Sequence, residues 1–148
     1  MELDDKHWKI LGLLQEDARI SLTTLARRVG LSVPATSERM KRLEELGVVV
    51  AYRALVSPQK VGYTVTALIG ITTPQPDKAR LLKLLNSKSE VLECFHVTGQ
   101  DSFVLKVVAR DIGHLETFVA SINHLGETRT SIVMPVPIPA RAIAAPGR

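Results

Sequence analysis

The chain has 148 residues, of which 45% are hydrophobic and 23% are charged, a balance that is typical of a folded globular protein and excludes a disordered one. The formal net charge of +4 and the pI of about 9.5 are compatible with an acidic partner such as nucleic acid. The single cysteine excludes an internal disulfide, and no apolar run approaches the roughly 18–20 residues that span a bilayer. Because the acidic N-terminus lacks a secretory signal pattern, we expect a cytoplasmic protein.

The first third of the chain has apolar residues at helical spacing and predicts three helices. Asp4 is the predicted N-cap of the first helix, Ser21 begins a short second helix, and Gly30 ends it. Ser32 caps the third helix, which Gly47 ends. The expected inner residues are Leu3, His7, Ile10, Leu11 and Leu14 in the first helix and Thr36, Met40, Leu43 and Leu46 in the third. The close spacing of stop and start signals predicts a tight turn between the second and third helices.

From Val48 onward the hydrophobic period changes to that of β-strands. Residues 48–56 predict a strand, and residues 57–62 predict a linker. The remaining elements are expected as strand 64–73, helix 77–86, strands 91–98 and 102–110, helix 112–124 and strand 128–136. Residues 99–101 supply the turn between the two middle strands. This βαββαβ order predicts a ferredoxin-like domain.

The sequence therefore predicts an α+β protein with two domains. Residues 1–50 form a winged-helix-like helix-turn-helix domain, and residues 51–62 form the strand and linker. Residues 63–137 form the ferredoxin-like domain, and the proline-containing residues 138–148 are expected to be a flexible tail.

The third helix has a polar, basic outer face, which is what a helix in the major groove requires. Five basic residues cluster within sixteen positions of the second and third helices and are opposed only by Glu38. Small residues at the start of the third helix allow close approach to bases, and the basic side chains can reach phosphates or guanine. The expected DNA-binding residues are Arg27, Arg28, Ser32, Pro34, Ser37, Arg39, Lys41 and Arg42. A three-helix bundle with a merely solvated basic face is the alternative, which the tight turn and short second helix disfavour.

The ordered series of short motifs resembles the Lrp/AsnC (leucine-responsive regulator/asparagine regulator) family. The matching residues of the first half are Leu3-Asp4, Ile10-Leu11, Asp17-Ala18-Arg19, Leu25-Ala26, Gly30-Leu31-Ser32, Arg39, Arg42-Leu43-Glu44, Gly47-Val48 and Tyr52. Those of the second half are Val97-Thr98-Gly99, Val104-Leu105-Lys106-Val107 and Thr128-Arg129-Thr130. The resemblance covers nearly the whole chain except the tail.

The resemblance implies double-stranded DNA as partner and a homodimer that forms through the C-terminal sheets, aided by the strand after the helix-turn-helix. Such dimers often assemble to octamers, and amino acids or related small molecules bind between dimers. A nucleoid-associated location follows. The expected effector-binding residues are Gly99, Gln100, Asp101, Ser102, Thr128 and Thr130. Glycine at position 99 also suits a turn whose amides cradle a carboxylate.

Two positions depart from the family pattern. His7 stands where the family commonly has an aspartate. Ser102 stands where many relatives have an aspartate, so the carboxylate of the turn is shifted by one residue to Asp101. Successive side chains of a strand point to opposite faces, and Asp101 therefore need not replace the missing group.

Catalytic and metal-binding patterns find little support in the sequence. It has no nucleophile elbow, no phosphate-binding Gly-rich loop and no His-Glu-x-x-His pair. Cys94 and His96 share one strand face, but no further ligands complete a tetrahedral site, so we expect no metal and no cofactor. His7, His114 and His124 are interpreted as ordinary surface or helix-end residues.

These patterns predict a sequence-specific DNA-binding transcription regulator that is not an enzyme, and the resemblance implies that an amino acid or related molecule modulates it. One alternative is an architectural, chromatin-like protein that binds DNA with little sequence preference and no effector. Another is a metabolic subunit whose ferredoxin-like domain binds amino acids and whose helical part docks a protein. The basic third helix argues against the second alternative.

Overall fold

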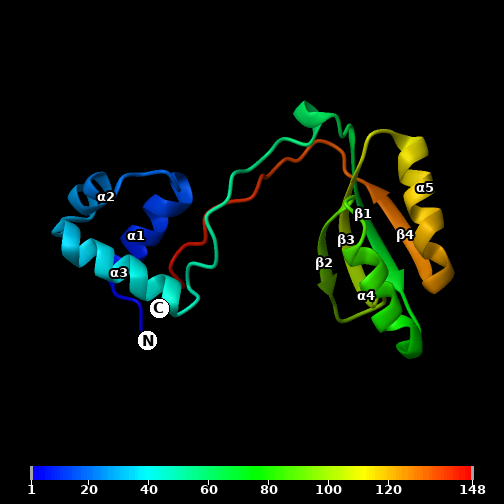
Figure 1. The fold of residues 1–148 in the computed structure, drawn as a ribbon, viewed down its shortest axis with the longest axis horizontal. Helices are drawn as coiled ribbons and strands as arrows, with labels where there is room; N and C mark the ends of the chain where they lie inside the picture. The colour runs from blue at the N-terminus through cyan, green and yellow to red at the C-terminus, as the bar shows by residue number, and fades with distance from the viewer. Residues whose placement is uncertain (1, 148) are drawn as a thin grey trace. The chain divides into compact units, whose positions relative to one another are not determined.

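The computed structural model describes residues 2–147, which form two compact units (Figure 1). The first unit combines the chain up to Leu55 with the C-terminal stretch from Ile138, and the second unit is Val56–Pro137. Within residues 2–147, none of the helices combines the length and the apolar character that crossing a membrane requires.

Three helices build the first unit, and local caps determine where each begins. They are α1 (Asp5–Glu16), α2 (Leu22–Val29) and α3 (Val33–Glu45). The Asp4 carboxylate accepts a hydrogen bond from the backbone N–H of His7 at 2.8 Å, and the side chains of Ser21 and Ser32 cap α2 and α3 in the same way. Gly30 ends α2 with φ of 74°, a left-handed conformation that favours glycine. The predicted helix starts and the end of α2 are confirmed.

The core of the first unit is apolar and draws on all three helices. Its buried members are Ile10, Leu11, Leu13, Leu14, Leu25, Val29 and Leu43. Thr36 is also fully buried, and its hydroxyl donates to the carbonyl of Ser32 at 2.9 Å. Leu46 was wrongly assigned to the inner stripe, because α3 ends there and Leu46 is 41% exposed. Gly47, with φ of 67°, then turns the chain.

The predicted strand at residues 48–56 is wrong for this chain, since these residues form no strand. A strand needs a hydrogen-bonding partner, and no described segment of the chain pairs with this one. Val49 packs against the first core, but most of the other apolar side chains of this segment are exposed, and Leu55 is 96% exposed. The Tyr52 hydroxyl donates to Glu44 Oε1 at 2.8 Å, and burial followed by this contact raises the pKa of Tyr52 to about 12.

The second unit is a four-stranded antiparallel sheet with two helices. Its elements are β1 (Val65–Thr72), α4 (Lys78–Asn86), β2 (Val91–His96), β3 (Phe103–Ala109), α5 (Ile112–Ile122) and β4 (Glu127–Ile132). Single 3-10 turns occupy residues 59–61, 75–77 and 123–125. The strand order is β2-β3-β1-β4, with every neighbouring pair antiparallel. The βαββαβ order and the ferredoxin-like fold are confirmed.

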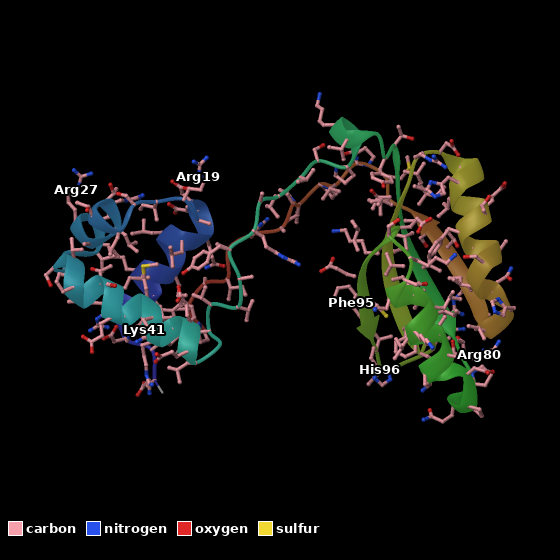
Figure 2. All side chains as sticks on the ribbon, viewed as in Figure 1. Arg19, Arg27, Lys41, Arg80, Phe95 and His96 are labelled. Atoms are coloured by element: carbon pink, nitrogen blue, oxygen red, sulfur yellow. The ribbon has the colours of Figure 1, made fainter. Side chains whose placement is uncertain are left out.

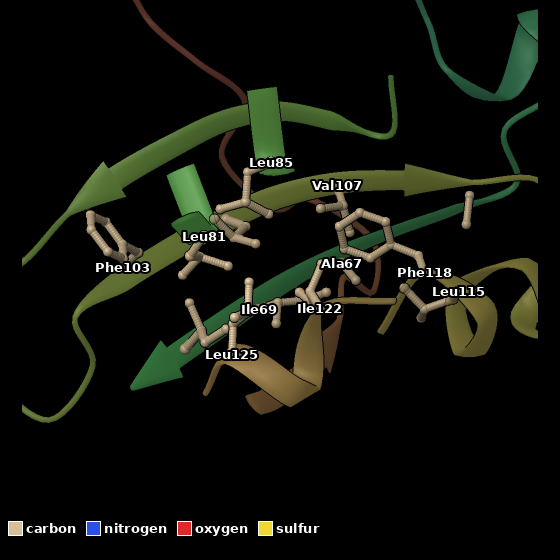
Figure 3. Packing of buried hydrophobic residues seen from close by; sticks show 13 residues of the cluster. Ala67, Ile69, Leu81, Leu85, Phe103, Val107, Leu115, Phe118, Ile122 and Leu125 are labelled. Carbon is tan, nitrogen blue, oxygen red and sulfur yellow. The ribbon is translucent and has the colours of Figure 1, made fainter. Parts of the chain in front are cut away.

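The two faces of this sheet have different surroundings. On one face, alternate residues of β1 and β3 pack with leucine and phenylalanine side chains of α4 and α5 (Figure 3). The buried residues of this core are Ala67, Ile69, Ile71, Leu81, Leu85, Phe103, Leu105, Val107, Ala109, Leu115, Phe118, Ile122 and Leu125. On the other face Leu68 is 43% exposed, and Phe95 is 49% exposed. The described residues of the second unit thus leave one sheet face open.

Candidate nucleic-acid interface and effector turn

Most of the predicted DNA-binding side chains lie on exposed positions of α2 and α3. Pro34, Ser37, Lys41 and Arg42 are exposed along α3, and Ser32 is exposed at its start, where its hydroxyl serves as the N-cap. Arg27 and Arg28 are exposed in the last turn of α2. Figure 2 shows Arg27 and Lys41 at different sides of the three-helix unit.

Arg39 does not join this exposed set. Its Nη1 atom donates to both carboxylate oxygens of Asp4, at 2.8 and 3.0 Å, and lies within 3.3 Å of both ring nitrogens of His7. The hydrogen bond from the His7 backbone, followed by the one from Arg39, lowers the pKa of Asp4 to about 2. Arg39 therefore joins α3 to the start of α1, and a contact of Arg39 with DNA would have to replace this ion pair.

His7 is buried, which confirms its predicted place on the inner face of the first helix and shows that it is a helix-end residue and not a surface one. It occupies the third position of α1, where its ring accepts a hydrogen bond from the Asp4 backbone N–H at 3.3 Å and closes a capping box. The side chain of His114 is also largely buried, and its Nε2 atom lies 3.1 Å from Glu90 Oε1. In both cases a polar partner accompanies the burial.

Acidic side chains lie close to the basic residues of α2 and α3. Lys41 Nζ is 3.7 Å from Glu45 Oε1, and Arg42 Nη1 is 4.0 Å from Glu45 Oε2. Arg28 Nη2 is 3.8 Å from Glu16 Oε2. Glu45 was not predicted as their partner, although it follows Lys41 by four residues and Arg42 by three, the spacings at which helix side chains meet. These pairs are exposed and each contributes about 0–1 kcal/mol, so phosphate groups can replace them.

The β2–β3 turn, where effector binding was predicted, is attached to the end of β1. Gly99 has φ of 113°, which favours glycine. The Thr72 hydroxyl donates to the carbonyl of Gln100 at 3.2 Å. The Ser102 hydroxyl accepts from the backbone N–H of Thr73 at 3.0 Å and lies 3.4 Å from its carbonyl. Residue 102 thus has a structural role in the turn.

Asp101 folds back from the turn onto the open face of the sheet. Its carboxylate pairs with Arg129 of β4 and lies over Gly70 of β1. A Cβ atom at Gly70 would lie 2.5 Å from the nearer carboxylate oxygen, so only glycine leaves room for this arrangement. The carboxylate of Asp101, which stands one residue before the position where the family pattern has an aspartate, is therefore already paired with Arg129.

Thr128 and Thr130 lie on the opposite face of the sheet from this ion pair. They are paired with Ile71 and Ile69, whose side chains point toward the helices, whereas Arg129 is paired with Gly70. The structure brings the turn residues together but does not bring the two threonines to the Asp101 side. Whether any of the six residues binds an effector stays a prediction.

Thr73, which lies beside the turn, was not among the predicted effector-binding residues. Its hydroxyl is buried and, within residues 2–147, has no hydrogen-bond partner. A buried polar group without a partner is costly, and it marks a place where an added ligand or water group would be stabilising. No pattern in the sequence indicates that this threonine is buried, because it follows the strand at a position where loops usually begin.

Cys94 and His96 do not form part of a larger ligand cluster in the described part of the chain. Cys94 is an exposed free cysteine, and the His96 ring lies against Phe103 with 5.2 Å between ring centroids. Among residues 2–147, no group of three or more His, Cys, Asp or Glu side chains is arranged to hold a metal ion.

Comparison with known proteins matches both units. Residues 3–50 match the family of winged helix-turn-helix DNA-binding domains, and residues 66–143 match the Lrp/AsnC ligand binding domain. The HTH-type transcriptional regulator LrpA of Mycobacterium tuberculosis is 37% identical over 131 residues, which are 86% of each chain. The HTH-type transcriptional regulator FL11 of Pyrococcus furiosus is 32% identical and covers 90% of this chain and 91% of that protein.

Solved structures of similar proteins include complexes with an amino acid. A transcriptional regulator of Neisseria meningitidis in complex with L-methionine is 30% identical, with a TM-score of 0.88 and 96% of each chain covered. A feast or famine regulatory protein of M. tuberculosis complexed with L-methionine is 33% identical, with a TM-score of 0.87, and covers 97% of this chain and 100% of that chain. These similarities extend over both units.

Proposed function

Because this chain belongs to the Lrp/AsnC family, it is a DNA-binding transcription regulator and not an enzyme, and we propose that an amino acid modulates its sequence-specific binding. The observation that carries the proposal is the exposed face of α3, which presents small and basic side chains opposite the buried Thr36 and Leu43. In this proposal the protein is nucleoid-associated and acts in the cytoplasm.

DNA contact divides between two kinds of residue. The N-terminal half of α3, from Ser32 to Ser37, approaches base edges, because its exposed side chains are short. Lys41 and Arg42 exchange their exposed contacts with Glu45 for phosphate oxygens. Arg27 and Arg28 anchor the adjacent backbone, and Arg39 keeps α3 in place through Asp4.

A second copy of the chain completes the functional unit. Two helix-turn-helix domains are needed to read half-sites that are one helical turn apart. The open sheet face, with Leu68 and Phe95 half-exposed, is the proposed dimer surface. Residues 48–56, which have strand-forming side chains and no partner within the chain, would pair with the same segment of the second copy. Further assembly of dimers toward an octamer is part of the same proposal.

The effector site is proposed at the β2–β3 turn. The turn joins β1 through Thr72 and Thr73, and the buried Thr73 hydroxyl beside it lacks a partner within the described chain. Two similar regulators have been crystallised with L-methionine, which supports an amino acid as the ligand class. Thr128 and Thr130 remain candidate contacts from the helix-facing side of β4.

Fluorescence anisotropy tests the proposal directly. The full chain is titrated against duplex DNA from upstream of its own gene and against a scrambled duplex, across a salt series. Each titration is repeated with L-methionine and with L-leucine. We expect the specific duplex to bind at least about 4 kcal/mol more tightly, because base contacts add to the phosphate contacts that both duplexes share.

The outcomes separate the three functional classes. A gap between duplexes that changes with an amino acid supports effector-modulated regulation, and by linkage DNA must change amino-acid affinity by the same factor. Equal affinities that fall together with salt would favour an architectural protein. No DNA binding near physiological salt would contradict both the regulator and the architectural protein. It would favour a metabolic subunit whose helical part docks another protein.

A further inference from the structure

Glu38 lies at the centre of the exposed face of α3. Residues of an α-helix are about 100° apart around its axis. Thr36 and Leu43, which are fully buried, define the inner line of α3. By this spacing, the line opposite them runs through Pro34, Glu38 and Lys41 and, at the far end of the helix, Glu45. When that face enters the major groove, Glu38 is the charged side chain of its first two turns that points straight toward the bases.

The carboxylate of Glu38 is not engaged by a cation in the described part of the chain. The three basic side chains nearest to it in sequence all have acidic partners. Arg39 contacts Asp4, and both Lys41 and Arg42 lie near Glu45. Glu38 lines a shallow depression along α3 together with Lys41, Arg42 and Glu45, and a second one between α3 and His7 of α1. An exposed acid on a solvated helix is ordinary, but one at the centre of a DNA-facing helix opposes the phosphate charge.

A carboxylate in the major groove is stabilised only where a base offers a donor. Cytosine presents only its N4 amino group there, whereas adenine presents its N6 amino group beside the N7 acceptor, guanine the N7 and O6 acceptors and thymine the O4 acceptor, so only cytosine offers a carboxylate a donor with no acceptor on the same base. Guanine or thymine opposite Glu38 would leave a desolvated carboxylate facing acceptors, which costs binding free energy. The neighbouring side chains Pro34, Ala35 and Ser37 are short, so α3 can approach closely enough for Glu38 to reach a base edge.

We propose that Glu38 is a specificity-determining residue that accepts a hydrogen bond from cytosine N4 in the major groove and disfavours guanine and thymine at that position. This inference rests on the proposed function and names one base that the site selects. It also gives the acid on α3 a role that the basic residues cannot have: phosphate contacts strengthen binding to every sequence, whereas Glu38 weakens binding to the wrong ones.

The test is selection of binding sites from a randomised duplex pool, with the bound fraction sequenced. The full-length protein is compared with Glu38→Ala and Glu38→Gln. We expect the unsubstituted protein to prefer cytosine at one position of each half-site. Glu38→Ala should reduce that preference by roughly 5- to 150-fold, the range for one good base contact, and should bind random duplexes more tightly. Glu38→Gln should shift the preference to adenine, whose N6 and N7 atoms suit an amide.

Glu45→Gln is the matched control, because it removes the same charge from the same helix beyond the groove-facing first turns. It frees Lys41 and Arg42, so it should raise affinity for all duplexes and leave every base preference unchanged. If the Glu38 variants select the same sequences as the unsubstituted protein, the inference is wrong and the proposed function stands. If the unsubstituted protein selects no sequence at all, the proposed function itself fails.

Discussion

The exposed face of α3 and the β2–β3 turn carry their polar side chains in different ways. On α3, Lys41 and Arg42 make only exposed contacts with Glu45, on the side of the helix away from the buried Leu43. In the turn, the polar side chains hold the structure together: Ser102 bonds to Thr73, and Asp101 pairs with Arg129. Substitutions of these exposed α3 side chains should therefore change binding and leave folding intact, whereas substitutions in the turn should change both.

The largest effects are expected in the two cores, which lie behind these surfaces. Leu43→Ala and Ile69→Ala each remove a fully buried side chain, one from each unit, and should each lower the free energy of unfolding by about 2–5 kcal/mol. Urea titration measures the total decrease in the free energy of unfolding. Fluorescence of Trp8, which packs against the first core, follows that unit separately. Hydrogen exchange compares the protection of backbone amides in the two units. If Leu43→Ala lowered this protection equally in both units, the two cores would not respond independently.

The face of α3 should respond to loss of charge without loss of structure. Lys41→Ala combined with Arg42→Ala removes two proposed phosphate contacts, so DNA affinity should fall roughly 100-fold or more and the salt dependence should weaken. Anisotropy and sedimentation measure affinity and assembly. The control is Lys78→Ala with Arg80→Ala, which removes two charges from α4. The control should bind DNA like the unsubstituted protein, and if the Lys41→Ala, Arg42→Ala variant did so too, α3 would not be the recognition helix.

The turn should respond to a single added methyl group on the strand beneath it. Gly70→Ala places a Cβ atom against the Asp101 carboxylate and should displace it from Arg129, at a cost of about 0–1 kcal/mol in stability, because the ion pair is partly exposed. Denaturant unfolding measures the cost. In a background of Asp101→Ala the same substitution should be nearly neutral, because the carboxylate is absent. An equal cost in both backgrounds would rule out the clash as the cause.

The smallest effect is expected from the cap of α1. The pKa of Asp4 in the folded protein, about 2, lies below its ordinary value of 3.8. The charged form therefore stabilises the fold above the ordinary value, and this stabilisation is lost as the pH falls through about 2. Asp4→Asn should therefore flatten the decrease in stability at acid pH. Thermal unfolding between about pH 2 and pH 6, a range that spans both pKa values of Asp4, measures this decrease. An unchanged limb would show that Asp4 does not couple folding to protonation.

Local signals in the sequence determined the helix boundaries and the order of the strands. Asp4, Ser21 and Ser32 each cap a backbone N–H three residues away, so sequence spacing is sufficient to locate them. Alternating apolar residues located the strands because the pleat has a period of two. The same locality explains the wrong strand at residues 48–56. Apolar, β-branched residues indicate strand propensity, but within residues 2–147 no segment pairs with them.

The tertiary structure decided which polar side chains are free. Arg39 is 35 residues from its partner Asp4, and Asp101 is 28 residues from Arg129. No spacing rule connects residues so far apart, and only the packing of α3 against α1 and of β4 against β1 brings them together. The sequence by itself predicted the fold and the family, which are confirmed, and α3 as the recognition helix, which stays a prediction. Which charges on that helix face outward was decided by packing, because a charged side chain takes the partner that the fold places within its reach.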